Sequence, residues 1–232
     1  MIFLRSLLFN ILFTAWAFVT SVLFAPLFLI SPKSAGKPWA RGALWLAKTI
    51  LGITHEVRGR EHLTNQPVIY ASKHQSAWDT IIFLVLLDAP CYVLKRELLR
   101  IPGWGWYLWR MGMIAIDRSG SASAMKQMLR DAKARISEGR TIVIFPEGTR
   151  KKPGDAPDYH PGVIALYSQL GVPTIPVALN SGLCWGKDAF FKTPGKIIIS
   201  FLPPIPPGLP KKEFMETLQP QIETESSALA GL

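Results

Sequence analysis

The sequence has little cysteine and few acidic side chains. Cys91 and Cys184 are the only two cysteines among 232 residues, and neither belongs to a CxxC pair. This scarcity argues against a disulfide framework and is typical of two free, buried thiols in a reducing compartment. The 16 acidic residues are outnumbered by 26 Lys and Arg, for a formal net charge of +10. Such a charge attracts polyanions, either nucleic acid or an anionic membrane surface.

Several functional signatures are also missing. The sequence contains no zinc-finger spacing, no aromatic RNA-binding signature and no long Lys/Arg run, so we expect no nucleic-acid partner. It has no Gly-x-Ser-x-Gly motif, which disfavours a serine hydrolase. It also has no cluster of His, Cys and carboxylates with metal-ligand spacing. We therefore expect neither a metal ion nor a bound cofactor.

A long apolar segment lies near the N-terminus. Residues 6–30 carry no charge, and as a straight helix they would extend roughly 37 Å, enough to cross a hydrocarbon core of about 30 Å. A cleaved signal peptide is the alternative, but it agrees poorly with the length of the run and with the missing small-x-small cleavage site. We expect a retained membrane helix.

Basic residues flank this segment unevenly. Arg5 precedes it, whereas Lys33, Lys37, Arg41 and Lys48 follow it. The positive-inside bias therefore predicts a location at the cytoplasmic (inner) membrane, with the rest of the chain facing the cytoplasm. A hydrophobic content of 49% leaves apolar surface that membrane lipid can cover.

A second helix is predicted for residues 37–53, where apolar side chains recur at helical spacing. It is either an interfacial helix, with its Trp side chains at headgroup level, or an ordinary core helix. Pro and Gly within residues 31–38 would let the first two helices fold back as a hairpin. We divide the chain into N-terminal membrane-anchoring helices at residues 1–54 and an α/β domain at residues 55–232.

Beyond residue 55, short β-rich runs alternate with helical runs. This alternation predicts an α/β fold with a mostly parallel central sheet flanked by helices. The expected strands are residues 68–72, 91–95, 113–117, 141–145, 174–179 and 196–201. The expected helices are residues 77–87, 97–111, 121–138, 161–170 and 212–228.

The first candidate for chemistry is the pair His74 and Asp79, between an expected strand and an expected helix. Residues five apart on one regular helix diverge by roughly 140° and would not meet. They can meet if His74 precedes the helix and Asp79 lies in its first turns, with Ser76 as the N-cap. Asp79 would then fix one ring nitrogen and leave the other as a base. The alternative is a histidine that only caps the helix.

The second candidate is the segment 145–150, which follows a buried strand at the edge where open α/β sheets bind ligands. Glu147 can accept a hydrogen bond from a hydroxyl, and Gly148 lets the backbone approach a ligand closely. Arg150 offers a planar fork that suits a phosphate. An ordinary turn with a solvated arginine is the alternative.

Two further strand ends carry candidates. Residues 112–118 end in Arg118, which would be a second phosphate ligand, and Lys95 after a neighbouring strand could add to the same basic site. Solvated ion pairs of little energetic value are the alternative for both. Two prolines in the segment 172–177 predict an edge or irregular strand. Side chains there could wall an acyl site or simply pack in the core: Val172, Pro173, Ile175 and Pro176.

Taken in order, these four segments resemble the four sequence blocks of the glycerolipid acyltransferase family. Within it, the chain is most similar to the bacterial enzymes that acylate 1-acyl-sn-glycerol 3-phosphate. The likeness extends over residues 68–179, and four short blocks in this order and spacing are specific. The second block departs at Ala115, where the family commonly has an aromatic. The blocks read His74-x4-Asp79, Gly112…Asp117-Arg118, Phe145-Pro146-Glu147-Gly148-Thr149-Arg150 and Val172-Pro173-x-x-Pro176-Val177.

The resemblance implies an activity and a mechanism. His74, oriented by Asp79, would remove the proton from the 2-hydroxyl of 1-acyl-sn-glycerol 3-phosphate (lysophosphatidic acid). The oxygen would attack the thioester of acyl-CoA or acyl-acyl carrier protein directly, giving phosphatidic acid for phospholipid biosynthesis. The N-terminal hairpin would lie in membrane lipid, in one leaflet or across both. The residues expected to hold the glycerol phosphate are Arg118, Glu147, Gly148, Thr149 and Arg150, with Lys95 beside them.

Two other interpretations stay open. A member of the same family could acylate another acceptor, such as glycerol 3-phosphate, a lyso-ornithine lipid or another lysophospholipid. The basic strand ends favour an acceptor that carries a phosphate. A non-catalytic basic protein bound to membrane or nucleic acid is the second interpretation, and it predicts that His74→Ala leaves function intact.

Overall fold

The computed structural model describes residues 1–33, 35–64, 66–117 and 122–232. The strands are β1 (Ile53–Arg58), β2 (Ile69–Ser72), β3 (Cys91–Lys95), β4 (Ile114–Ile116), β5 (Ile142–Ile144), β6 (Thr174–Leu179) and β7 (Gly195–Phe201). They form one seven-stranded sheet in the order β1-β7-β6-β2-β5-β3-β4. Every neighbouring pair of these strands is parallel except β6 and β7. The mostly parallel sheet confirms the predicted fold class.

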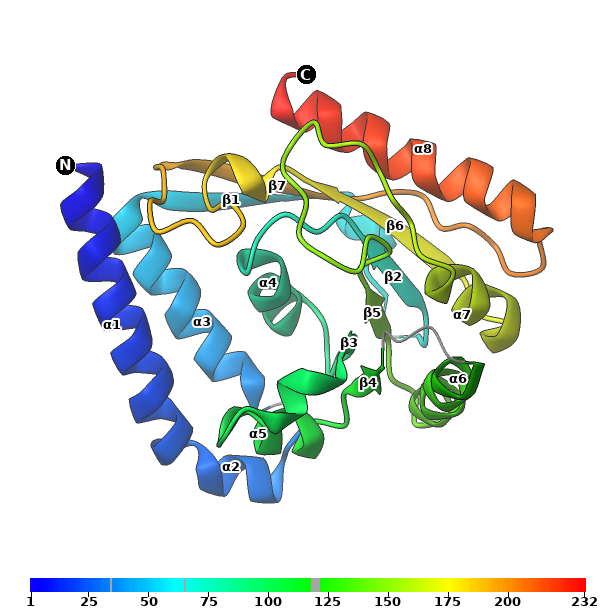
Figure 1. Ribbon diagram of the computed structural model, residues 1–232, viewed down its shortest axis with the longest axis horizontal. Helices are drawn as coiled ribbons and strands as arrows, with labels where there is room; N and C mark the ends of the chain where they lie inside the picture. The colour runs from blue at the N-terminus through cyan, green and yellow to red at the C-terminus, as the bar shows by residue number, and fades with distance from the viewer. Residues whose placement is uncertain (34, 65, 118–121) are drawn as a thin grey trace.

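Helices cover both faces of this sheet (Figure 1). The helices are α1 (Ile2–Leu23), α2 (Ala25–Ile30), α3 (Gly36–Leu46), α4 (Trp78–Leu86), α5 (Trp104–Arg110), α6 (Ala122–Ser137), α7 (Gly162–Leu170) and α8 (Lys211–Ala230). Short single turns are η1 (Ala47–Leu51), η2 (Arg60–His62), η3 (Arg96–Arg100) and η4 (Ser181–Leu183). One side of the sheet carries α1, α3 and α4, and the other carries α6, α7 and α8.

Two hydrophobic cores follow from this layering, because successive side chains of a strand point to opposite faces. Tyr70 of β2 and Val143 of β5 enter the core on the α4 side. Their neighbours Ile69, Ala71 and Ile142 enter the core on the α6 side. Both faces of the central strands are therefore apolar, and this is why continuous hydrophobic runs predicted them.

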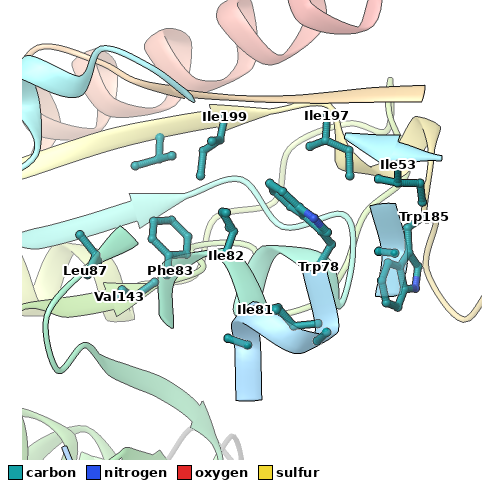
Figure 2. Close-up of a cluster of buried hydrophobic side chains, with 14 of the residues drawn as sticks. Ile53, Trp78, Ile81, Ile82, Phe83, Leu87, Val143, Trp185, Ile197 and Ile199 are labelled. Carbon is teal, nitrogen blue, oxygen red and sulfur yellow. The ribbon is translucent and has the colours of Figure 1, made fainter. Parts of the chain in front are cut away.

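The core on the α4 side fixes the beginning of α4. Trp78, the first residue of this helix, is 1% exposed and lies beside Ile197 of β7, as Figure 2 shows. Phe83, further along the helix, is fully buried in the same core. Burial of a side chain such as Phe83 contributes about 1.5–3 kcal/mol. The first turn of α4, which carries Asp79, therefore has a fixed position relative to the sheet.

The structure adds a strand that the sequence did not predict. β1 forms the edge of the sheet and pairs in parallel with β7, from Ile53 opposite Gly195 to Arg58 opposite Ser200. Most of its side chains are exposed or half-buried, so it lacks the hydrophobic run that marked the other strands. The predicted domain boundary after residue 54 falls inside β1.

Two local predictions need correction. The expected helix at residues 97–111 is divided into η3 and α5, because Pro102 cannot continue a helix and Gly103 adopts a φ of +74°. Of the two alternatives expected for the segment with Pro173 and Pro176, an edge strand or an irregular strand, the edge position is wrong, since β6 lies between β7 and β2. Pro176 is tolerated there because the β6–β7 ladder ends at Val177 and the next paired residues are Thr174 and Ile205. Between them Pro176 takes part through its carbonyl, which accepts the N–H of Leu202 at 2.9 Å.

The N-terminal helices fold back as a hairpin, as predicted, with α1 on the outside of the molecule and α3 beside it (Figure 1). The Trp16 indole donates to the Trp39 carbonyl at 3.2 Å, and a Cβ added at Gly42 would lie 2.1 Å from the Trp16 ring. α3 buries Ala40 and Ala43 but leaves Trp45 63% exposed. α1 is long and apolar enough to cross a membrane, and only 11% of its apolar window is buried.

Candidate active site

The loop between β2 and α4 brings His74 and Asp79 together. His74 lies in the loop and Asp79 in the first turn of α4, and the distance from Nδ1 of His74 to Oδ2 of Asp79 is 3.0 Å. Ser76 is not the N-cap, because that position is Ala77. The Ser76 hydroxyl nevertheless accepts the N–H of Trp78 at 3.1 Å. The pair therefore meets across a loop-to-helix junction, as its five-residue spacing requires.

Asp79 is fully buried, and both of its carboxylate oxygens accept hydrogen bonds. Oδ2 accepts the N–H groups of Gln75 at 2.7 Å and Ser76 at 2.8 Å, besides its contact with His74. Oδ1 accepts the hydroxyl of Ser181 at 2.5 Å. Charge-assisted bonds of this kind hold the carboxylate in one orientation.

His74 is held by its backbone as well as by its ring. Its N–H donates to Oε2 of Glu147 at 3.0 Å, and its carbonyl accepts the N–H of Lys151 at 2.8 Å. The imidazole stacks on Phe145 at a centroid distance of 4.0 Å. Since Nδ1 contacts Asp79, Nε2 is the ring nitrogen left to receive a proton from a substrate in the adjoining cavity.

Glu147 faces inward, which corrects its expected role as a ligand of a substrate hydroxyl. Its side chain is 0% exposed, and its two oxygens bind Nζ of Lys73 at 2.8 Å and the N–H of His74. Lys73 also pairs with Glu223 of α8 at 2.7 Å, and Tyr159 donates to Glu223 at 2.8 Å. Burial raises the pKa of Glu147, and Lys73 opposes that shift. Glu147 therefore positions His74 and the buried Lys73.

An apolar cavity of about 250 Å³ opens beside the His74 ring. The N-terminal helices contribute Phe24, Phe28 and Trp39 to its wall, and α5 contributes Tyr107. The cavity is therefore shared between the N-terminal helices and the α/β domain, with the His74 imidazole among its lining groups.

A second cavity of about 250 Å³ adjoins the first, sharing Val93, Phe145 and Gly148 in its wall. It lies at the carboxyl ends of β3, β4 and β5, where Asp117 and His160 are its polar lining groups. Both cavities are mainly apolar, and Phe145 and Gly148 at the β5–α7 turn line both of them.

The remaining residues of the second candidate segment occupy this turn. Gly148 has a φ of +61°, and a Cβ added to it would lie 2.6 Å from the ring of His160. Thr149 is exposed. Arg150 is partly exposed and its Nη2 donates to Asp188 at 2.7 Å. This guanidinium keeps donors that a phosphate could engage.

The basic residues of the neighbouring strand ends are only partly placed. Lys95 lines the first cavity, and its ammonium lies 3.4 Å from Glu97 in an exposed pair. Arg118 lies outside the described residues.

The fourth segment packs in the core, which was one of its two expected roles, and the other role, as the wall of an acyl site, is not borne out. Ile175 points into the core on the α4 side, and Val172 packs against the core on the α6 side. Neither of these residues lines either cavity, and the same holds for Pro173 and Pro176. The reason is that β6 is an interior strand covered on both faces.

Both cysteines are buried free thiols, as predicted. Burial raises the pKa of Cys91 to about 11 and also raises the pKa of Cys184. Neither thiol is therefore poised as a nucleophile.

Comparison with known proteins adds the family. The model of the family described as Acyltransferase matches residues 54–180, more than half of the chain. The chain belongs to this acyltransferase family. A 1-acyl-sn-glycerol-3-phosphate acyltransferase from Pseudomonas aeruginosa is 38% identical over 199 residues, covering 84% of this chain and 77% of that protein. The 1-acyl-sn-glycerol-3-phosphate acyltransferase alpha of Mus musculus is 34% identical over 163 residues, 68% of this chain and 57% of its own length.

The fold of this acyltransferase also matches a solved structure. The crystal structure of the 1-acyl-sn-glycerophosphate acyltransferase PlsC from Thermotoga maritima is similar with a TM-score of 0.80 over 100% of this chain and 99% of that one, at 23% identity. At this identity the likeness shows the fold, including the N-terminal helices.

Two groups of this acyltransferase site had no signal in the sequence, and a third was assigned no contact. Ser181 and Glu223 lie 102 and 150 residues away from their partners Asp79 and Lys73, so no local motif joins them. Phe145 is predicted as the end of a strand and the start of the second candidate segment, and its stacking with the His74 ring is not predicted. Only the fold brings these groups to the histidine.

Proposed function

We propose that this acyltransferase transfers a fatty acyl group from a thioester to the 2-hydroxyl of 1-acyl-sn-glycerol 3-phosphate, giving phosphatidic acid. The donor is acyl-CoA or acyl-acyl carrier protein. The observation that carries the proposal is the His74–Asp79 pair, whose free ring nitrogen belongs to a histidine in the wall of an apolar cavity. The names of the Pseudomonas aeruginosa and Mus musculus relatives support the acceptor.

The chemistry follows from the pair. Nε2 of His74 takes the proton from the acceptor hydroxyl as its oxygen attacks the thioester carbonyl. The C–O bond forms, the C–S bond breaks, and the proton passes from the imidazolium to the departing sulfur. Asp79 holds the imidazole in one orientation and stabilises the imidazolium between these steps. No group of the protein carries the acyl chain covalently.

The first cavity suits the acyl chains of a lysophospholipid reaction. Its wall contains Phe24, Phe28 and Trp39, which are matched to a hydrocarbon chain entering from lipid. The acceptor phosphate belongs with the two cationic side chains near His74, which are Lys95 in the wall of this cavity at the end of β3 and Arg150 in the β5–α7 turn. Bidentate donation by Arg150 would fix the phosphate and thereby the hydroxyl.

The membrane location is part of the same proposal, with the α/β domain on the cytoplasmic side. The α/β domain contacts both ends of α1: the Lys192 N–H donates to Ser6 at 3.0 Å, and the Tyr107 hydroxyl donates to the Ser21 carbonyl. A helix of 22 residues is about 33 Å long. An α1 that spanned the bilayer would carry Ser6 to the far interface and pull it from Lys192. These contacts favour α1 lying in one leaflet.

Labelling of single cysteines tests this location in sealed vesicles. Ile2→Cys marks the start of α1, and Lys212→Cys marks the α/β domain; the two native cysteines are buried. A membrane-impermeant maleimide is expected to label both positions in inside-out vesicles and neither in right-side-out vesicles. Labelling of the two positions from opposite sides would show that α1 spans the bilayer.

A substrate panel tests the activity. The purified enzyme is offered lysophosphatidic acid, glycerol 3-phosphate, a lyso-ornithine lipid and a lysophosphatidylcholine, each with acyl-CoA and with acyl-acyl carrier protein. We expect phosphatidic acid from lysophosphatidic acid to form fastest. Turnover of other acceptors together with no turnover of lysophosphatidic acid would contradict the proposal and favour the alternative acceptor that is used.

A further inference from the structure

Ser181 lies in the active site although it is remote from His74 in the sequence. It opens the short turn η4, which follows β6 directly after Asn180. Its side chain is fully buried, and its hydroxyl donates to Oδ1 of Asp79 at 2.5 Å. A hydroxyl donating to a buried carboxylate makes one of the stronger kinds of hydrogen bond in proteins.

The hydrogen bond from Ser181 serves a different carboxylate oxygen of Asp79 from the other hydrogen bonds. The three other donors to Asp79, which are His74 and the N–H groups of Gln75 and Ser76, all bind Oδ2. In the described part of the chain, Ser181 is the single donor to Oδ1. Without it, Oδ1 would be a buried charged oxygen with no partner, which is costly.

The position of Ser181 is itself fixed by the fold. Its neighbour Asn180 is buried, and the Asn180 amide donates to the Leu229 carbonyl of α8 at 2.9 Å. The Asn180 amide oxygen accepts the N–H of Ile198 in β7 at 2.8 Å. The turn that presents the hydroxyl is therefore held by two other elements of the domain and not by Asp79 alone.

A second hydrogen bond joins the same two segments. The N–H of Gly182 donates to the side-chain oxygen of Gln75 at 2.9 Å. The consecutive residues Ser181 and Gly182 thus hold the two ends of the same segment. Ser181 binds Asp79 in the first turn of α4, and Gly182 binds Gln75 in the loop before it. A pair of adjacent bonds between segments about 100 residues apart fixes both the distance and the rotation of the carboxylate.

We propose that Ser181 is a positioning residue of the acyl-transfer reaction, which acts by holding and partly neutralising Asp79 so that Oδ2 stays directed at His74. The proposal rests on the proposed function only in its choice of assay, because the geometry applies to any acceptor whose proton His74 removes. Ser181 does not contact the substrate cavities.

The role has a consequence for the pH dependence of the rate. The Ser181 hydroxyl disperses the negative charge of Asp79. When the hydroxyl is removed, the undispersed charge beside His74 attracts the imidazolium more strongly, and the acid limb of the kcat/KM profile moves to higher pH.

The experiment compares Ser181→Ala with Ser226→Ala in the full-length enzyme. Ser226 of α8 is also buried, and its hydroxyl accepts the N–H of Leu179 at 3.4 Å, near the same end of β6 but away from Asp79. Rates are measured from pH 5 to pH 9 with an acceptor that the wild type turns over, and melting temperatures are measured in parallel.

For Ser181→Ala we expect kcat to fall about 10- to 100-fold, the range for a lost hydrogen bond to a charged group. The KM values should be unchanged and the acid limb should move up by about one pH unit. Ser226→Ala should match the wild type in kcat and in pH profile. A fall in kcat without a moved acid limb, a change in KM alone, or rates equal to those of Ser226→Ala would each overturn the role of Ser181. Failure of the wild type to acylate lysophosphatidic acid would instead contradict the proposed function.

Discussion

Lys73 is a buried cation whose removal should destabilise the protein in a pH-dependent way. Its side chain is 3% exposed and its ammonium contacts Glu147 at 2.8 Å and Glu223 at 2.7 Å. Lys73→Met keeps most of the aliphatic stem and removes the charge. The two carboxylates are then left facing each other without a cation between them.

The magnitude follows from the burial of the network. Breaking a buried ion pair by removing one partner costs about 3–5 kcal/mol at neutral pH. For a chain of this length each kcal/mol shifts the melting temperature by about 2–4 °C, so we expect a fall of roughly 10 °C.

The sign of the pH dependence follows from the pKa of Glu147, which burial raises above its usual value. Lys73 limits that rise, so its removal moves the pKa of Glu147 further up. A carboxyl group with a raised folded-state pKa costs stability when it must ionise, and the cost disappears once it is protonated. The deficit of Lys73→Met relative to the wild type should therefore be large at pH 8 and smaller at pH 5.

Differential scanning fluorimetry in detergent at both pH values measures this effect. Lys196→Met is the matched control, because Lys196 pairs with Glu56 at 3.1 Å at the exposed edge of the sheet. Exposed pairs contribute at most about 1 kcal/mol, so the control should lower the melting temperature by no more than about 4 °C. A Lys73→Met deficit that equals the control, or that is the same at pH 5 and pH 8, would refute the reasoning.

Three further predictions concern other parts of the molecule. Gly42→Leu should separate α3 from Trp16 of α1 and cost about 1–3 kcal/mol by overpacking, and an unchanged melting temperature would show that the helices do not pack this closely. The thiols of Cys91 and Cys184 should resist Ellman's reagent at pH 8 in the native protein and react after denaturation, because burial raises both pKa values; rapid native labelling would contradict this. Arg150→Ala should raise the KM for the acceptor roughly tenfold while changing kcat less, and an unchanged KM would remove Arg150 from the phosphate site.

The sequence predicts the central strands well because their environment is uniform. Strands β2 and β6 are buried on both faces, so each is a continuous apolar run. The edge strand β1 gave no such run, since its exposed side chains include Thr54 and His55, and its pairing with β7 joins residues some 140 positions apart. A hydrophobic pattern indicates which residues are buried. It does not predict an exposed strand that forms only by pairing with a distant segment of the chain.

The candidate active site was also predictable from the sequence only in part. His74 and Asp79 could be paired from the sequence because their geometry is decided within one loop and one helical turn. The inward orientation of Glu147 depends on Lys73, and the orientation of Asp79 depends on Ser181. These contacts join segments that are far apart in the sequence, so the sequence does not reveal them. Residue type alone therefore suggested a ligand role for Glu147 that its buried position does not allow.

The central claim is that His74 is the base of the acyl transfer. The most direct test is the initial rate of phosphatidic acid formation by the wild type and by His74→Ala, with lysophosphatidic acid and acyl-CoA both saturating and the melting temperatures compared. We predict that His74→Ala loses at least about 10²-fold in kcat, the usual scale for a general base, with an unchanged melting temperature. A folded His74→Ala variant that keeps its rate within a few-fold of the wild type would contradict the account.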